Sequence, residues 1–185
     1  YDENNVYFTL TDGSVLIVPR GKNGGAGEND PSDIIKFEDL NVKSALLQMD
    51  IDTNGDGEIS YGEAAAYTGS ILMKNNTNIL SFKEFQYFTS ISTRLGNDII
   101  YSSSSVKEYV SFQGCSNLFE IILPNTIDTI GAFAFAHCSK LKRIILPKDL
   151  VCIGNDAFYE CTSLSDINIP DKIEYIGVGA FYKCP

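Results

Sequence analysis

The residues best suited to chemistry lie in an acidic segment between positions 52 and 63. Oxygen-bearing residues occupy its first, third, fifth, seventh, ninth and twelfth positions: Asp52, Asn54, Asp56, Glu58, Ser60 and Glu63. Ca²⁺ takes about six to eight oxygen ligands, and a loop with this spacing can supply them. Asp52, Asn54 and Asp56 would offer side-chain oxygens. Glu58 would offer its backbone carbonyl, Ser60 a water-mediated contact and Glu63 both carboxylate oxygens. The spacing therefore predicts a site for one calcium ion.

The segment also has the two other features of an EF-hand loop. Gly57, at the sixth position, permits a sharp bend, and Ile59, at the eighth, is expected to point into the core. An amphipathic helix should precede the loop, with Asn41 as its N-cap. Its apolar face would consist of Val42, Ala45, Leu46 and Met49. We expect a structural ion, because extracellular loops of this type bind Ca²⁺ at about 10⁻⁴–10⁻³ M and stay filled. The alternative is an Asp- and Asn-rich turn that binds no ion.

A second loop of this kind is not predicted. The nearest candidate, residues 73–84, has Met73 at the first ligand position and Asn78 in place of the loop glycine. Residues 70–91 fit better as an irregular leucine-rich repeat, because the terminal repeats of a solenoid cap its core and are atypical.

Apolar residues, cysteines and prolines recur every 23 residues in the second half of the chain. The unit reads C-x-x-L-x-x-I-x-L/I-P-x-x-I/L-x-x-I-G-x-x-A-F-x-x and then returns to C. Its first part predicts one strand of a parallel ladder that Pro ends, and its I-x-x-I-G part predicts the opposite wall. The A-F-x-x-C part predicts a short helical or 3₁₀ turn whose Phe fills the core. Because one unit cannot bury its apolar face alone, the units must stack as a solenoid.

Four of the five cysteines occupy one slot of this repeat: Cys115, Cys138, Cys161 and Cys184. We expect a stack of buried thiols, since free Cys behaves as a small hydrophobe. Disulfides between adjacent rungs are the alternative, because stacked strands lie within bridging distance.

These motifs resemble the BspA-like leucine-rich-repeat family of bacterial surface proteins. The resemblance covers roughly residues 106–185, and the segment IGNDAFYECTSLSDINIP is close to the family consensus. It implies a surface protein, which in some members adheres to host proteins. The family pattern consists of scaffold positions and carries no catalytic residues.

The predicted fold class is α+β. It is a right-handed leucine-rich-repeat solenoid with a parallel β-ladder, capped on its N-terminal side by an EF-hand-like helix–loop–helix. Residues 1–20 alternate apolar and polar side chains around a turn and predict a β-hairpin or the end of an upstream domain. Residues 21–33 are Gly-rich and predict a flexible linker. Residues 34–69 form the calcium segment, and residues 70–185 form the solenoid, which is irregular to about residue 110.

Outward positions of the ladder define a candidate binding surface. It consists of Phe119, Ile122, Lys142, Arg143 and Ile145. Its apolar members, Phe119, Ile122 and Ile145, are expected to form a small exposed patch, which can mark a contact site. Ordinary strand residues on a solvated sheet are the alternative, and cross-strand charge pairs around Arg143 need no partner to explain them.

We predict no enzymatic activity. The only histidine, His137, lies beside Cys138, but Glu160 and Lys183 fill the same slot in later repeats, so His137 is expected to be a variable surface residue. The net charge of −10 argues against nucleic acid as a partner. No apolar run is long enough to cross a bilayer.

Three functions remain open. The leading hypothesis is a secreted or surface-anchored module that binds a protein or glycan of the host or a neighbouring cell, with any signal or anchor upstream. The second is a structural spacer that displays another domain, and the third is a calcium-responsive switch. The last strand, near residues 164–169, is expected to have an unpaired edge. Either further repeats continue the ladder there, or a partner covers the edge, for example in a homodimer.

Overall fold

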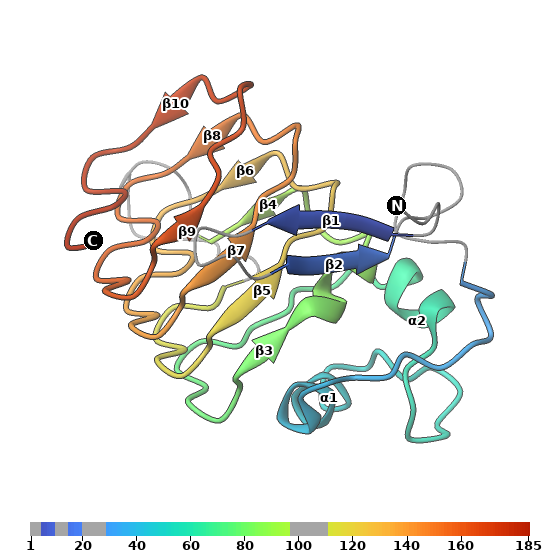
Figure 1. Cartoon of the computed structure of the whole chain (residues 1–185). Helices are drawn as coiled ribbons and strands as arrows, with labels where there is room; N and C mark the ends of the chain where they lie inside the picture. Colours follow the sequence, from blue (N-terminus) through green and yellow to red (C-terminus); the bar gives the residue numbers. More distant parts are fainter. Residues whose placement is uncertain (1–4, 10–14, 20–28, 97–110) are drawn as a thin grey trace.

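A computed structural model describes residues 5–9, 15–19, 29–96 and 111–185. Two parallel four-stranded sheets face each other and form the two walls of a solenoid (Figure 1). The first sheet contains β3 (Ser81–Phe82), β5 (Glu120–Ile122), β7 (Arg143–Ile145) and β9 (Asp166–Ile167). The second contains β4 (Arg94–Leu95), β6 (Thr129–Ile130), β8 (Cys152–Ile153) and β10 (Tyr175–Ile176). Each rung contributes one short strand to each sheet, so the predicted parallel ladder and opposite wall are both present.

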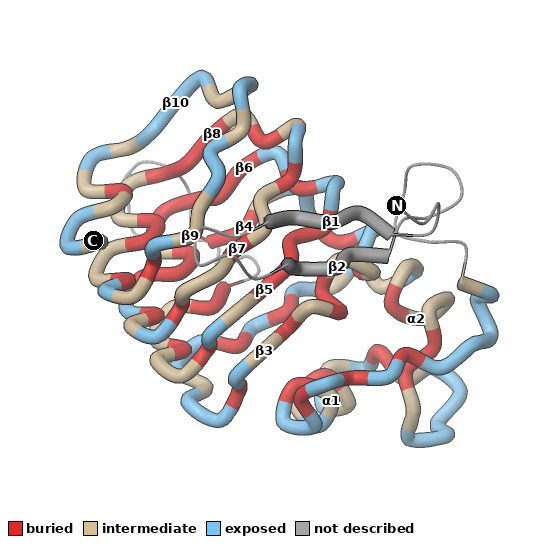
Figure 2. Tube along the Cα trace, in the orientation of Figure 1, coloured by how far each residue is buried: buried red, intermediate tan, exposed pale blue. Residues whose placement is uncertain are grey.

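The register of the sheets follows the sequence repeat. Glu120 of β5 pairs with Arg143 of β7, which pairs with Asp166 of β9. Equivalent positions therefore stack directly above one another. Figure 2 shows buried segments along the walls of the middle rungs, whereas β9 is intermediate and β10 is exposed.

The core of the solenoid is a ladder of identical side chains. The rings of Phe112, Phe135, Phe158 and Phe181 stack nearly parallel, with 5.3 Å between successive centroids. The predicted role of this Phe as the core filler is confirmed, because the first three rings are fully buried. Stacked rings at this distance contribute about 0.5–1.5 kcal/mol per pair beyond the area they bury.

A second ladder consists of the repeated cysteines, all of which are free thiols. Each Sγ donates to a backbone carbonyl of the preceding rung, at 2.9–3.2 Å. Burial raises the pKa of Cys115 and of Cys161 to about 12, so these thiols stay protonated. The structure therefore contains the expected thiol stack and not the alternative set of disulfides.

The turn before each of these cysteines uses left-handed backbone conformations. Gly114, His137, Glu160 and Lys183 occupy the same slot in successive rungs, and all have φ between 57° and 75°. Only Gly adopts this region without strain. The turn geometry is therefore imposed by the rung as a whole and not by a glycine in each copy.

The first rung departs from the regular pattern. A 3₁₀ helix, η1 (Lys83–Tyr87), follows β3 and precedes β4. Met73 occupies the slot of the core Phe in later rungs. Its carbonyl accepts the Cys115 thiol, as the carbonyl of Phe112 accepts the Cys138 thiol in the next rung. The serine run at 102–105 lies outside the described residues.

The N-terminal part contains two helices and a strand pair. Strands β1 (Asn5–Thr9) and β2 (Val15–Pro19) pair antiparallel. Helices α1 (Leu40–Leu46) and α2 (Tyr61–Ala66) flank the acidic loop. Most of the predicted linker at 21–33 lies outside the described residues.

The expected N-cap of α1 is wrong by two residues. The cap is Asp39, whose Oδ1 accepts the N–H of Asn41 at 2.9 Å. Both residue types are good caps. Asp39 takes the position because its other oxygen binds the first sheet.

Candidate calcium loop and interaction surface

The exit from the acidic loop is anchored to the chain that precedes α1. The carbonyl of Ile59 accepts the N–H of Ile35 at 2.9 Å, and the N–H of Tyr61 donates to Asp33 at 3.0 Å. Ile34 and Ser60 form the intervening antiparallel bridge. Ile59 itself is fully buried, which confirms that the eighth loop position points into the core.

Side chains of the first half of the loop accept hydrogen bonds from the loop's own backbone. Asp52 accepts the N–H groups of Gly55 and Gly57, at 2.8 and 2.9 Å. Asn54 accepts the N–H of Asp56, and Asp56 accepts that of Glu58, each at 2.8 Å. The glycine at the sixth position has φ of +79°, so its predicted role in the bend is confirmed. These bonds curl the backbone around the three side chains.

Glu63 closes the other side of the loop. Its Oε1 accepts the N–H and the hydroxyl of Thr53, at 2.8 and 3.0 Å. Its Oε2 accepts the N–H and the hydroxyl of Ser60, both at 2.9 Å, in a capping box at the start of α2. Desolvation would raise the pKa of Glu63, but the hydrogen bonds from Ser60 and Thr53 outweigh it and lower the pKa to about 2. Glu63 is therefore an anion that spans the loop from its first turn to its exit.

The oxygen types fit calcium, whereas their present arrangement does not converge on one point. In the residues that the structure describes, no group of three or more His, Cys, Asp or Glu side chains is placed to hold a metal ion. Glu63 is committed to Thr53 and Ser60, and the side chain of Glu58 pairs with Lys43 at 2.6 Å. Glu58 was expected to offer its backbone carbonyl, which this pairing leaves available. Calcium ligation would require Glu63 to exchange hydrogen bonds for the ion.

The predicted binding surface is only partly exposed. Phe119 is 39% exposed, and the guanidinium of Arg143 lies 5.6 Å from the centre of its ring. Lys142 and Ile145 are half-buried. Phe119 and Lys142 directly precede β5 and β7, and Arg143 and Ile145 lie on β7, so these four residues form a partly accessible strip.

Ile122 was expected in this patch, and that prediction is wrong. It is only 5% exposed, although it does not belong to the central hydrophobic cluster. Alternation along a strand predicts exposure only where one face of the sheet meets water. The outer face is covered at this end of β5, so both faces exclude solvent there.

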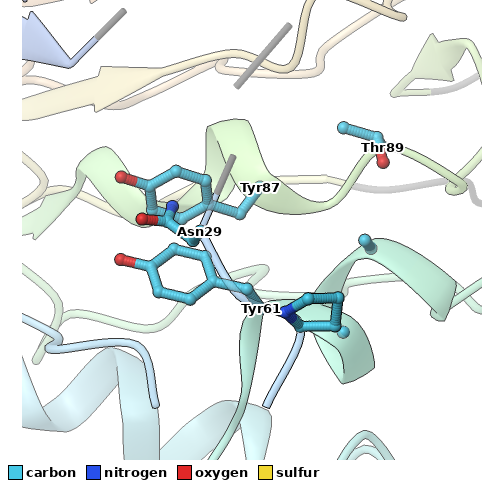
Figure 3. Close-up of a pocket in the computed structure, with 7 residues that line it drawn as sticks. Asn29, Tyr61, Tyr87 and Thr89 are labelled. Carbon is cyan, nitrogen blue, oxygen red and sulfur yellow. The ribbon is translucent and has the colours of Figure 1, made fainter. Parts of the chain in front are cut away.

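A shallow pocket of about 140 Å³ lies between Asn29–Pro31, the start of α2 and η1 (Figure 3). Tyr61 and Tyr87 line it, with ring centroids 4.8 Å apart and planes at 80°. The pKa of Tyr87 is raised, mainly by burial and to a smaller extent by the neighbouring Tyr61. The pocket joins segments far apart in the sequence, so no local pattern could have predicted it.

His137 and Cys138 do not form a catalytic pair. His137 is exposed, and its Nδ1 lies 3.1 Å from Glu160. The Cys138 thiol is fully buried and donates to the carbonyl of Phe112. Burial raises the pKa of Cys138 further from the range of a reactive thiolate.

Residues 81–185, more than half of the chain, match the family described as "BspA type Leucine rich repeat region", in six copies. The chain therefore belongs to the BspA-type leucine-rich-repeat family. Proteins of this type are typically interaction modules at the bacterial surface. In the part of the chain that the structure describes, no helix is long and apolar enough to cross a membrane.

Two solved leucine-rich-repeat proteins are similar to this chain. One, from Bacteroides ovatus, is 35% identical over 49% of this chain and 25% of its own length, with a TM-score of 0.39. Another, from Eubacterium ventriosum, is 26% identical over 68% of this chain and 36% of its own length, with a TM-score of 0.43. The chain thus spans about a quarter to a third of these proteins. No curated protein matches it.

Proposed function

We propose that this protein is a calcium-stabilised recognition module of the bacterial surface, which binds a protein or glycan along the outer side of its first sheet. The observation that carries the binding role is the strip formed by Phe119 and Arg143. An aromatic ring half open to solvent with a guanidinium over it is the combination enriched at binding hot spots. The adjoining Lys142 adds a second cation to this strip.

The regularity of the scaffold supports the same role. Because equivalent positions stack in register, each rung places its outward side chains at a fixed spacing. A rigid surface of this kind orders few groups on binding, which limits the entropic cost of association. Extended repeat surfaces are used for recognition for this reason.

One calcium ion would stabilise the N-terminal cap. Asp52, Asn54, Asp56, Glu58, Ser60 and Glu63 are the residues that would hold it. A hard cation would neutralise the carboxylates of this acidic loop once they turn toward it. The buried Ile59 and the bonds from Ile35 and Tyr61 fix the exit of the loop and support this proposal.

Calorimetric titration tests the calcium proposal. Ca²⁺ should bind with a stoichiometry of one, and Asp52→Ala should abolish binding. Asp171→Ala removes an exposed carboxylate of the solenoid and serves as the control that keeps binding. Absence of heat at millimolar Ca²⁺ in the unmodified protein would refute the proposal.

A binding panel of purified extracellular-matrix proteins and immobilised glycans tests the recognition role. Any partner found should lose at least tenfold in affinity with Phe119→Ala, whereas Lys148→Ala, at an exposed position on a turn, should bind normally. Binding unchanged by Phe119→Ala would place the site elsewhere. No binding across the panel would favour the spacer hypothesis.

A second copy of the chain is the further partner that we propose, at the C-terminal edge. Among the described strands, β9 pairs only with β7, and β10 only with β8. Tyr175, Ile176 and Val178 are exposed on this last rung. Light scattering after size exclusion should show a dimer that Ile176→Lys dissociates, and a monomer at high micromolar concentration would rule the dimer out.

A further inference from the structure

The boundary between the loop unit, residues 34–69, and the first rung contains two buried carboxyl groups. Asp39 is 7% exposed and Glu84 is 5% exposed. Buried acids are rare unless hydrogen bonds or opposite charges compensate them. The two groups differ in how far they are compensated.

Asp39 is fully provided with partners. Its Oδ1 caps α1, and its Oδ2 accepts the N–H groups of Leu80 and Ser81, at 2.5 and 3.3 Å. Desolvation would raise its pKa, but the hydrogen bonds from Leu80, Asn41 and Ser81 outweigh it and lower the pKa. Asp39 therefore holds α1 to the edge of the first sheet as an anion.

Glu84 is provided with partners on one side only. Its Oε1 accepts the N–H of Glu38 at 3.0 Å, which ties η1 to the segment that leads into α1. Its Oε2 is buried and has no hydrogen-bond partner in the part of the chain that the structure describes. A buried carboxylate oxygen without a partner costs more than the same oxygen in a neutral carboxylic acid.

Burial raises the pKa of Glu84 more than the nearby charge of Lys83 lowers it, so Lys83 compensates the carboxylate only in part. Lys83 is the nearest cation, but its Nζ lies 2.9 Å from Glu38 and 3.0 Å from Glu120 of β5. Glu38 adds negative charge in the segment that precedes α1, and Asp39, the N-cap of α1, is an anion. The packed elements also contain Tyr87 of η1 and Tyr61 of α2, whose ring centroids are 4.8 Å apart, as well as Lys43 of α1 and Glu63 of α2.

We propose that Glu84 is a proton-operated latch between the loop unit and the first rung. As a neutral acid, Glu84 keeps its bond to the Glu38 N–H and leaves no uncompensated charge in the interface. As a carboxylate, it loosens the docking of the loop unit on β3 and η1. The latch depends on this interface alone and needs no calcium.

The direction of the pH dependence follows from the burial of the group. Burial raises the pKa of Glu84 above its ordinary value of 4.5. The contribution of Glu84 to the free energy of unfolding is therefore fully present below about pH 4.5. It is lost as the pH rises through the pKa that Glu84 has in the folded protein. For each unit by which the pKa of Glu84 in the folded protein exceeds its pKa in the unfolded chain, the equilibrium constant for unfolding rises about tenfold between low and high pH.

Urea unfolding between pH 5 and pH 8, with EDTA present throughout, tests the latch. The unmodified protein should lose stability as the pH rises, and Glu84→Gln should lack this step, since an amide keeps the acceptor and cannot ionise. Glu174→Gln is the control, because it removes an exposed carboxylate of the last rung and should retain the step. Identical pH profiles for the unmodified protein and Glu84→Gln would overturn the proposal.

A spectroscopic titration keeps the proposal testable even if Glu84→Gln folds poorly. The side-chain ¹³C signal of Glu84 in the unmodified protein should titrate with a midpoint above 4.5. The hydrogen-exchange protection factor of the Glu38 amide should fall over the same pH range. A midpoint at or below 4.5, or constant protection, would refute the latch.

Discussion

Replacing Phe135 by Ala should be among the most destabilising changes in the solenoid. The ring is fully buried and stacks on Phe112 and on Phe158, each at 5.3 Å. Loss of a buried Phe costs about 3–5 kcal/mol. Two stacked neighbours place Phe135 toward the upper end of this range, because each stack is worth about 0.5–1.5 kcal/mol.

Phe181 is the matched comparison within the same ladder. It has the same chemistry and the same slot, but it is half-buried and, among the described rings, stacks on Phe158 alone. We expect Phe181→Ala to cost about half as much, roughly 1–2.5 kcal/mol, because it removes one stack and leaves a site open to water. Urea denaturation followed by far-UV circular dichroism measures both values, with free energies from linear extrapolation.

A double-mutant cycle separates stacking from burial. Phe135 and Phe158 should show a coupling of about 0.5–1.5 kcal/mol, whereas Phe112 and Phe158, two rungs apart, should be additive within about 0.5 kcal/mol. Equal costs for Phe135→Ala and Phe181→Ala, together with additivity of the adjacent pair, would refute the view that the rungs are held through a ring ladder.

Three other outcomes follow from the described contacts. Asp39→Ala should destabilise the protein by about 1–3 kcal/mol in urea unfolding, because it removes the cap of α1 and the acceptor of the Leu80 and Ser81 N–H groups; a loss below about 0.5 kcal/mol would contradict this role. Ile122→Lys should lower the melting temperature strongly, because Ile122 is buried, whereas Phe119→Lys should change it little. Equal shifts would mean that the outer face of the first sheet is open at both positions. A thiol reagent should modify Cys184 first and the buried cysteines only after denaturant is added; rapid modification of every thiol in the native protein would contradict the stack.

The rung architecture could be predicted because a solenoid repeats its environments. Each core slot recurs at the same interval, so the sequence repeat directly reports the register that pairs Glu120 with Arg143. The EF-hand pattern similarly placed Ile59 in the core and the bend at Gly57. Local spacing carried enough information in both cases because neighbouring residues define the feature.

The features that escaped prediction depend on contacts between distant segments. Asp39 and Asn41 are equally plausible caps by residue type, and the choice is made by the bonds from Asp39 to Leu80 and Ser81. Glu84 lies between aromatic residues in the segment SFKEFQYF, and its contact with the segment before α1 is not visible in that local pattern. Ile122 alternates like an outward residue, although its face of the sheet is covered.

The left-handed slot occupied by Gly114, His137, Glu160 and Lys183 has a consequence for how such a surface can diversify. The backbone strain at this slot is borne by the rung, so side chains of either charge, or none, can be exchanged there without changing the scaffold. β-branched residues are the exception, because they tolerate this conformation poorly. The backbone position of each site in this row is fixed, whereas its side chain can vary. Single substitutions there can therefore change what the surface binds.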